Sequence, residues 1–90
     1  MTETLTEQIV ELKESVVKEH VLVLFDDNVN TFDHVIELLV KVCKHDVVQA
    51  EQCATLVHYT GKCAVKKGTF KELQLMAELL GDSGLTVEVN

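Results

Sequence analysis

Residues 24–35, LFDDNVNTFDHV, join a β-branched apolar run to a segment with helical periodicity. The preceding run, residues 20–25, is apolar on both alternating faces, which is typical of a strand that is covered within its sheet. The junction holds three carboxylates and two amides, although a plain connection needs only one turn residue and one helix cap. This surplus of polar groups needs a reason beyond chain connection.

Two polar residues of the junction have a structural interpretation. Asn30 is placed to cap the following helix by accepting from the amide of Phe32 or Asp33, and Asp33 favours the positive end of that helix. Residues 26–28, Asp-Asp-Asn, remain unexplained at the end of the strand. From spacing alone they form either a solvated turn or part of a binding site.

Local patterns predict the elements that follow the junction. Apolar residues recur at helical spacing over 35–43, and Asp46 with Gln49 forms an N-cap pattern for a second helix that Gly61 ends. Within residues 62–67, Cys63 and Val65 alternate with positions that include Lys62 and Lys66, which predicts a strand with one solvated face.

The last third of the chain continues in the same way. Thr69 and Glu72 form a capping box for a third helix that runs to Leu80, and residues 85–89 alternate as a third strand. The predicted fold is therefore α+β, a single small domain in the order β-α-α-β-α-β. We expect a three-stranded antiparallel sheet with three helices packed on it, formed by residues 18–90, after a flexible N-terminal extension over residues 1–17.

Composition restricts the partners of this domain. The chain has 90 residues, a formal net charge of −7 and 47% hydrophobic residues, as in one small acidic domain. Eight basic residues do not supply the dense positive surface that nucleic acids or anionic membranes need. We therefore expect neither as a partner, and a cationic ligand fits the charge better.

The N-terminal residues and the cysteines argue against a secreted protein, a disulfide framework and a zinc site. Residues 1–4 lack the pattern of a secretory signal, and no apolar run reaches membrane-spanning length, so a cytoplasmic location is expected. Cys43, Cys53 and Cys63 contain no C-x-x-C pair, so we expect small buried hydrophobes rather than a disulfide framework or a zinc site.

His58 lies in the last turn of the second predicted helix. There a histidine can satisfy free carbonyls and interact favourably with the helix dipole, which is a sufficient structural explanation by itself. The alternative is a ligand contact.

Read together, these segments closely resemble ClpS, the family of adaptors that deliver N-degron substrates to Clp proteases. The family carries Asn-Asp-Asp after its first strand, matching residues 26–28, and His-x-x-Gly-Lys or similar after its second helix, matching residues 57–62, VHYTGK. The resemblance is ungapped over residues 20–67 and continues to Asn90 across a shorter third helix. In this chain the Asn and the second Asp of the family motif are exchanged, so the number of carboxylates is unchanged.

The resemblance implies a binding protein rather than an enzyme, with no cofactor. It would recognise the free α-amino group and the large apolar side chain of a substrate's first residue. Asp26, Asn28 and His58 match the family positions that hold the amine, and Asp27 between them is expected to contribute charge and loop shape. The apolar pocket that the resemblance implies is lined by Asn30, Phe32, Val35, Ala54, Val57 and Leu85.

Two pocket positions depart from the family pattern. Phe32 replaces a common Met at the gate, and Ala54 replaces a larger residue, often Met. A larger gate that faces a smaller wall conserves volume but changes shape. We therefore expect an apolar first residue among Leu, Phe, Tyr and Trp.

The resemblance also implies a protein partner, the N-terminal domain of a ClpA-type or ClpC-type ATPase. The extension over residues 1–17 would be engaged during delivery. Lys71 stands where the family often has an acidic docking residue, so the family's docking site is not transferred to this chain.

Other function classes have less support. An enzyme would pair Asp26 or Asp27 with His58 and use Ser83 or a cysteine as nucleophile, but no catalytic motif accompanies them. A metal site is not expected, because no two of the four histidines lie at i and i+4 on one helix. The alternative function is a chaperone-binding regulator, or another interaction module of the same fold as in the C-terminal domain of the ribosomal stalk protein, without N-degron recognition.

Overall fold

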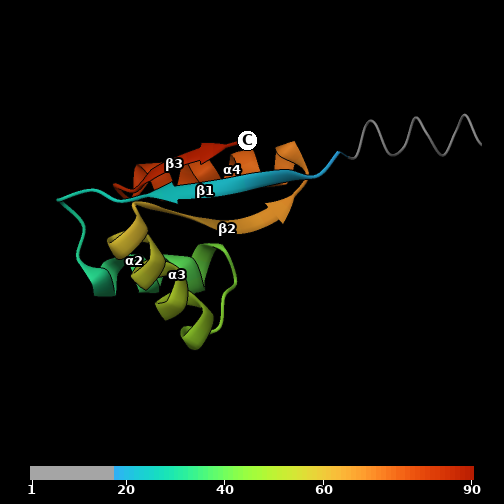
Figure 1. Cartoon of the computed structure of the whole chain (residues 1–90). Coiled ribbons are helices and arrows are strands. Elements are labelled where there is room, and N and C mark those ends of the chain that lie inside the picture. The colour runs from blue at the N-terminus through green and yellow to red at the C-terminus, as the bar shows by residue number, and fades with distance from the viewer. Residues whose placement is uncertain (1–17) are drawn as a thin grey trace, which may run out of the picture.

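A computed structural model of the chain describes residues 18–90, so the extension predicted over residues 1–17 lies outside the described residues. The predicted order β-α-α-β-α-β is confirmed (Figure 1). The elements are β1 (His20–Phe25), α2 (Phe32–Val42), α3 (Val47–Thr60), β2 (Lys62–Gly68), α4 (Phe70–Asp82) and β3 (Thr86–Val89).

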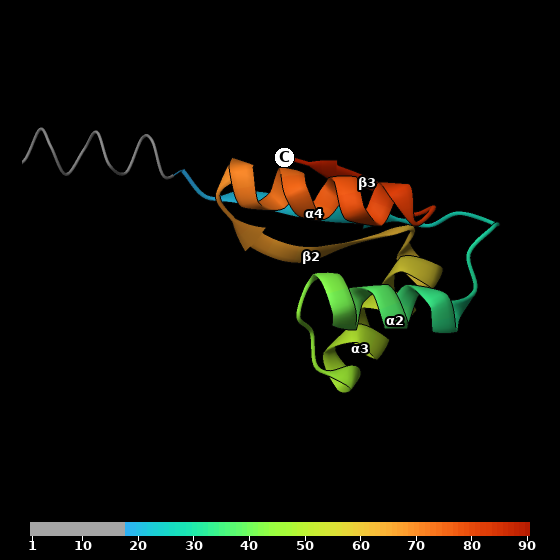
Figure 2. The ribbon, with the colours of Figure 1, turned by 180° about the vertical axis from the view of Figure 1, so that it is seen from behind.

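The three strands form one antiparallel sheet in the order β2-β1-β3, with β1 in the centre. Leu24 of β1 lies opposite Cys63 of β2 and Val87 of β3. The helix α4 runs along the sheet, while α2 and α3 form a hairpin below β2, as the front and back views show (Figures 1 and 2). This arrangement brings the end of β1, the start of α2 and the end of α3 to one end of the molecule.

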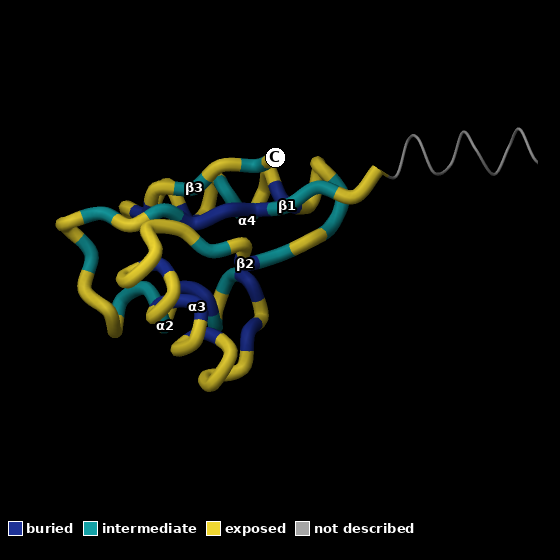
Figure 3. The backbone as a smooth tube through the Cα atoms, viewed as in Figure 1, coloured by how far each residue is buried: buried dark blue, intermediate teal, exposed yellow. Residues whose placement is uncertain are grey.

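The core lies between the sheet and the helices. Burial is concentrated along β1 and on the inner sides of the helices, whereas the β1–α2 connection is largely exposed (Figure 3). Leu22 and Leu24 of β1 are almost completely inaccessible, and Val23 on the opposite face is also buried. A strand buried on both faces explains the continuous apolar run before residue 26. The largest fully buried side chains are Leu22, Leu24, Leu39, Leu73, Leu80 and Cys43.

Two predicted helix caps are confirmed. The Asp46 carboxylate accepts from the N–H of Gln49 at 2.7 Å at the start of α3, and the Thr69 hydroxyl accepts from the N–H of Glu72 at 3.2 Å at the start of α4. Gly61 ends α3 with φ 92°, a left-handed conformation that glycine adopts without a steric penalty.

The cap predicted for α2 is wrong. Thr31, not Asn30, is the N-cap residue, and its hydroxyl accepts from the N–H of His34 at 3.1 Å. The side chain of Asn30 instead donates to the Asp27 carboxylate and to the carbonyl of Gly84, both at 2.8 Å. The side chain of Asn30 is therefore used in contacts within the loop and with Gly84, and not in the helix cap that the local pattern predicts.

The cysteines follow the prediction in two of three cases. Cys43 and Cys53 are buried, whereas Cys63 is only partly buried. Burial raises the pKa of the Cys43 thiol to about 11 and that of the Cys53 thiol to about 12. Both are therefore neutral thiols at physiological pH, as expected of small hydrophobes in the core. None of the helices within residues 18–90 has the length and apolar character to cross a membrane.

Candidate functional site

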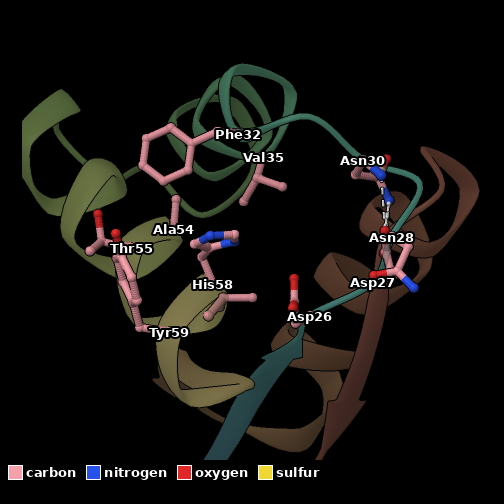
Figure 4. Close-up of a pocket in the computed structure, with 11 residues that line it drawn as sticks. Asp26, Asp27, Asn28, Asn30, Phe32, Val35, Ala54, Thr55, His58 and Tyr59 are labelled. Carbon is pink, nitrogen blue, oxygen red and sulfur yellow. Dashed lines mark hydrogen bonds between the residues drawn. The ribbon is translucent and has the colours of Figure 1, made fainter.

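A pocket of about 670 Å³ opens where the β1–α2 loop, the start of α2 and the second half of α3 meet (Figure 4). We name it the loop–helix pocket. It contains every site residue predicted from the sequence except Leu85, together with two that were not predicted. Its lining residues are Asp26, Asp27, Asn28, Asn30, Phe32, Val35, Ala54, Thr55, Val57, His58 and Tyr59.

Leu85 does not line the loop–helix pocket. Its side chain is 5% exposed and belongs to the hydrophobic core. It borders a separate void of about 20 Å³ that it shares with Val35 and Val57. Leu85 therefore lies near the apolar wall without forming part of its surface.

The β1–α2 loop is organised by the carboxylate of Asp27. One oxygen accepts from the N–H groups of Val29 and Asn30, both at 2.9 Å, and the side-chain amide of Asn30 donates to both oxygens. These bonds, with the Asn30 N–H as the largest contribution, lower the pKa of Asp27 below its usual value. Asp27 thus serves the loop as an ionised turn acceptor.

The same loop is attached to the connection between α4 and β3. The amide of Asn30 donates to the Gly84 carbonyl at 2.8 Å, and the ring Nε2–H of His34 donates to the Ser83 carbonyl at 3.2 Å. Two side chains near the start of α2 therefore hold a segment far along the chain. This attachment determines where one side of the loop–helix pocket lies.

Asp26 differs from its neighbour in its contacts. Its N–H donates to the carbonyl of Gly61 at 2.9 Å, which joins the end of β1 to the end of α3. Its side chain is exposed and faces the hollow in Figure 4. Within residues 18–90 the side-chain hydrogen bonds of this loop involve Asp27 and Asn30, and none goes to the Asp26 carboxylate. Asp26 thus presents an uncommitted acceptor to the pocket.

His58 stands on the other side of the hollow, in the last turn of α3. Its ring packs edge-on against Tyr59, with ring centroids 5.0 Å apart. The N–H of Gly61 donates to the Val57 carbonyl at 2.9 Å, so glycine supplies the helix-ending bond that was one explanation for the histidine. Among the described residues the His58 ring has no hydrogen-bond partner, which leaves its nitrogens available to a ligand.

The remaining wall is apolar. Val35 contributes from α2, and Ala54 and Val57, both almost fully buried, contribute from α3. Thr55 and Tyr59 were missed in the sequence. Each follows a predicted site residue by one position and the two are four apart on α3, so helical spacing places them on one stripe.

Asn28 lies with Asp27 and Asn30 on the loop side of the pocket, away from the α3 side chains (Figure 4). Ser83, the nucleophile of the enzyme alternative, does not line the pocket, and its hydroxyl donates to the Leu79 carbonyl at 3.0 Å. Across residues 18–90 no three metal-ligating side chains come together. The pocket therefore combines one free carboxylate, amide and imidazole acceptors, and an apolar wall, which suits a ligand with a cationic end and an apolar side chain.

Comparison with known proteins identifies the family and the fold of the chain. The family model described as "ATP-dependent Clp protease adaptor protein ClpS" matches residues 5–88. No curated protein matches the chain. Among solved structures, the chain is similar to Agrobacterium tumefaciens ClpS2 bound to L-phenylalaninamide, with a TM-score of 0.67 and 16% identity over 81% of this chain and 98% of that one. At this identity the likeness supports the fold.

Proposed function

Because this chain belongs to the ClpS family of adaptors of the ATP-dependent Clp protease, we propose that its loop–helix pocket binds the first residue of N-degron substrates. The adaptor would hold the free α-amino group and the large apolar side chain, and deliver the substrate in the cytoplasm to a Clp AAA+ unfoldase. One observation carries this proposal. The carboxylate of Asp26 and the ring of His58, which have no hydrogen-bond partner within residues 18–90, face the same hollow as the apolar wall.

An α-ammonium group suits the polar side of this pocket. It is positively charged near neutral pH and offers three donors, so it needs several acceptors and a nearby negative charge. Asp26 supplies the charge, and the Asn28 amide oxygen and a neutral His58 nitrogen supply further acceptors. The net charge of −7 also favours the approach of a cation.

Asp27 has a different role in this proposal. Its carboxylate is occupied by the hydrogen bonds of the loop, so it fixes the positions of its neighbours Asp26 and Asn28. Its lowered pKa keeps it negatively charged, which adds to the field at the amine. The exchange of Asn and Asp relative to the family motif then places the directly binding carboxylate at residue 26.

The apolar wall accounts for the second half of the recognition. Burial of one Leu or Phe side chain contributes about 1.5–3 kcal/mol, and each hydrogen bond to a charged group about 1.5–3 kcal/mol. After the costs of ordering, a Kd of about 1 μM is expected. The similar Agrobacterium protein is bound to L-phenylalaninamide, an amino-acid amide with an apolar ring.

Delivery requires a second contact. We propose the N-terminal domain of a ClpA-type or ClpC-type ATPase as the partner, with residues 1–17 engaged during transfer. Lys71 is exposed in the first turn of α4, so an electrostatic contact there would involve an acidic residue of the ATPase. Neither catalysis nor a cofactor forms part of the proposal.

The test is fluorescence anisotropy with peptides that differ only in their first residue, Phe, Leu or Arg, and an N-acetylated Phe control. We expect micromolar binding of the apolar peptides and a loss of about 100-fold or more on acetylation, because the charge is removed and buried acceptors stay unpaired. A folded sample that binds no free amino terminus would overturn the proposal and favour the chaperone-binding regulator.

A further inference from the structure

The chain uses few aromatic residues, and the loop–helix pocket contains a large share of them. The chain has three Phe and one Tyr, of which Phe32 and Tyr59 line this pocket. Phe32 is 46% exposed and Tyr59 is 79% exposed, so burial in the core does not account for either ring. Because both exposed rings line the cavity, their faces and edges are accessible to a ligand side chain that enters it.

The rings come from two helices that meet at the pocket. Phe32 is the first residue of α2, and Tyr59 with His58 lies in the last turn of α3. Tyr59 and His58 already pack edge-on at an interplanar angle of 77°. The pocket therefore has aromatic side chains on both helices, above an apolar wall.

Ala54 sets the space between these rings. In Figure 4 its methyl group lies between Phe32 and His58, and all three residues line the pocket. Ala54 and His58 are four residues apart on α3 and therefore share one stripe of the helix. A methyl at this position leaves room for a ligand side chain to lie on Ala54 and contact the rings of Phe32 and His58.

We infer that the pocket selects an aromatic first side chain, Phe, Tyr or Trp, over Leu, and this inference rests on the proposed function. Aromatic pairs in offset or edge-to-face contact gain affinity beyond the area that they bury, equivalent to about two- to twelve-fold for each pair. Leu has no aromatic face and gains only from burial. Phe32 is the residue that sets the preference, because it is the phenyl ring on the α2 side of the pocket.

The experiment compares free peptides that are identical from the second residue onward and begin with Phe, Tyr, Trp or Leu, with N-acetylated Phe as the amine control. We expect the aromatic peptides to bind at least about five-fold more tightly than the Leu peptide. In Phe32→Leu the Phe-to-Leu ratio of affinities falls towards one, because the aromatic contact on the α2 side of the pocket is removed. Phe70→Leu is the matched control, because Phe70 is 53% exposed but packs against His20 outside the pocket.

A second variant tests the space between the rings. Ala54→Met fills it and reduces Phe and Trp binding more than Leu binding, provided that circular dichroism shows a folded protein. If Ala54→Met unfolds, Phe32→Leu decides the question. Equal wild-type affinity for Phe and Leu, or an unchanged ratio in Phe32→Leu, overturns this inference and leaves the proposed function standing. Failure of every free-amine peptide overturns both.

Discussion

Asp26 and Asp27 show how two adjacent, identical side chains come to differ in chemistry. Asp27 receives backbone and side-chain donors from Val29 and Asn30, so its acceptors are used inside the loop. Asp26 receives none of these donors and faces the hollow. The difference comes from the direction of the chain after β1 and not from the residue type. A carboxylate without internal donors is the one that an incoming ammonium can bind.

Asp27→Asn is expected to lower the Tm and to weaken peptide binding, because the loop loses an ionised acceptor. The folded-state pKa of Asp27 is lowered, so its contribution to stability is present above the unfolded pKa of about 3.9 and is lost as the pH falls through the folded pKa. The Tm difference between wild type and variant should therefore be constant from about pH 8 to 5 and shrink below about pH 4. Thermal unfolding across this range checks the sign, and a difference that grows on acidification would contradict it.

His58→Ala is expected to weaken binding of a free Phe peptide by about ten-fold or more, with little change in Tm. The ring is exposed and, within residues 18–90, has no hydrogen-bond partner, so its removal costs the folded protein little. Anisotropy and thermal unfolding of the same sample separate the two effects. A parallel loss of Tm and affinity would assign the ring a structural role.

Asp26→Ala is expected to cost about ten- to one-hundred-fold in binding of the same peptide, since the charged partner of the amine is removed. The acetylated peptide, which carries no charge, should show a much smaller change. Glu78→Gln is the control, because this carboxylate is exposed on α4 outside the pocket. Equal losses for the free and the acetylated peptide would place Asp26 away from the amine.

At the scale of elements, sequence patterns predicted correctly those helix ends that depend only on contacts within the same turn. The caps at Asp46 and Thr69 and the end of α3 at Gly61 depend on residues within one turn, and all three are confirmed. The predicted cap of α2 was wrong because the Asn30 side chain donates to Gly84. This contact joins residues 54 positions apart and has no local sequence pattern that would indicate it. Local sequence patterns therefore predict elements well and their tertiary attachments poorly.

The site shows the same division. Periodicity alone placed Val35 in one predicted helix and His58 at the end of the next, and only the resemblance to ClpS brought these distant segments into one site. The structure places those residues around one pocket but places Leu85 in the core, where the shorter third helix had made the correspondence weakest. Tyr59 was missed because residues were taken from matching family positions, without following the helical stripe.

The end of α3 supports a prediction at the scale of one element. Gly61→Ala should destabilise the domain by about 1 kcal/mol or more, because φ 92° is unfavourable for a residue with a Cβ, although no atom of residues 18–90 lies within 4 Å of the added group. Gly81→Ala is a matched control inside α4 whose added group also meets none of the described atoms within 4 Å, and it should be neutral or stabilising. Thermal unfolding distinguishes them, since about 1 kcal/mol shifts Tm by roughly 4–8 °C in a domain of this size. Equal shifts in Tm for the two variants would contradict the prediction that position 61 needs a glycine.

At the scale of the whole molecule, the loop–helix pocket depends on segments from both halves of the chain. The loop after β1 supplies Asp26, α3 supplies His58, and the connection before β3 holds the loop through Gly84. Non-local contacts of this kind form only when the domain is folded. Binding at the pocket is therefore linked to global stability, and ligands that bind the folded state should raise Tm.

Asn30→Ala removes one of the two side-chain links between the start of α2 and the α4–β3 connection, and leaves the bond from His34 to Ser83 in place. We expect a lower Tm and faster amide hydrogen exchange both in residues 26–30 and in residues 83–85, because the side chain donates to Asp27 and to Gly84. Exchange in β2, outside this link, serves as the internal reference. Faster exchange confined to residues 26–30 would show that only the loop is affected and that the bond from Asn30 to Gly84 does not couple the two segments.

The bond from the N–H of Asp26 to the carbonyl of Gly61 has a consequence for how such a site diversifies. Main-chain atoms hold residue 26 beside the end of α3, so its position is independent of its side chain. Substitution there alters what the pocket attracts without altering where the pocket is. The exchange of Asn and Asp between residues 26 and 28 is a change of that kind, and a scaffold that separates placement from chemistry can acquire new ligand preferences one residue at a time.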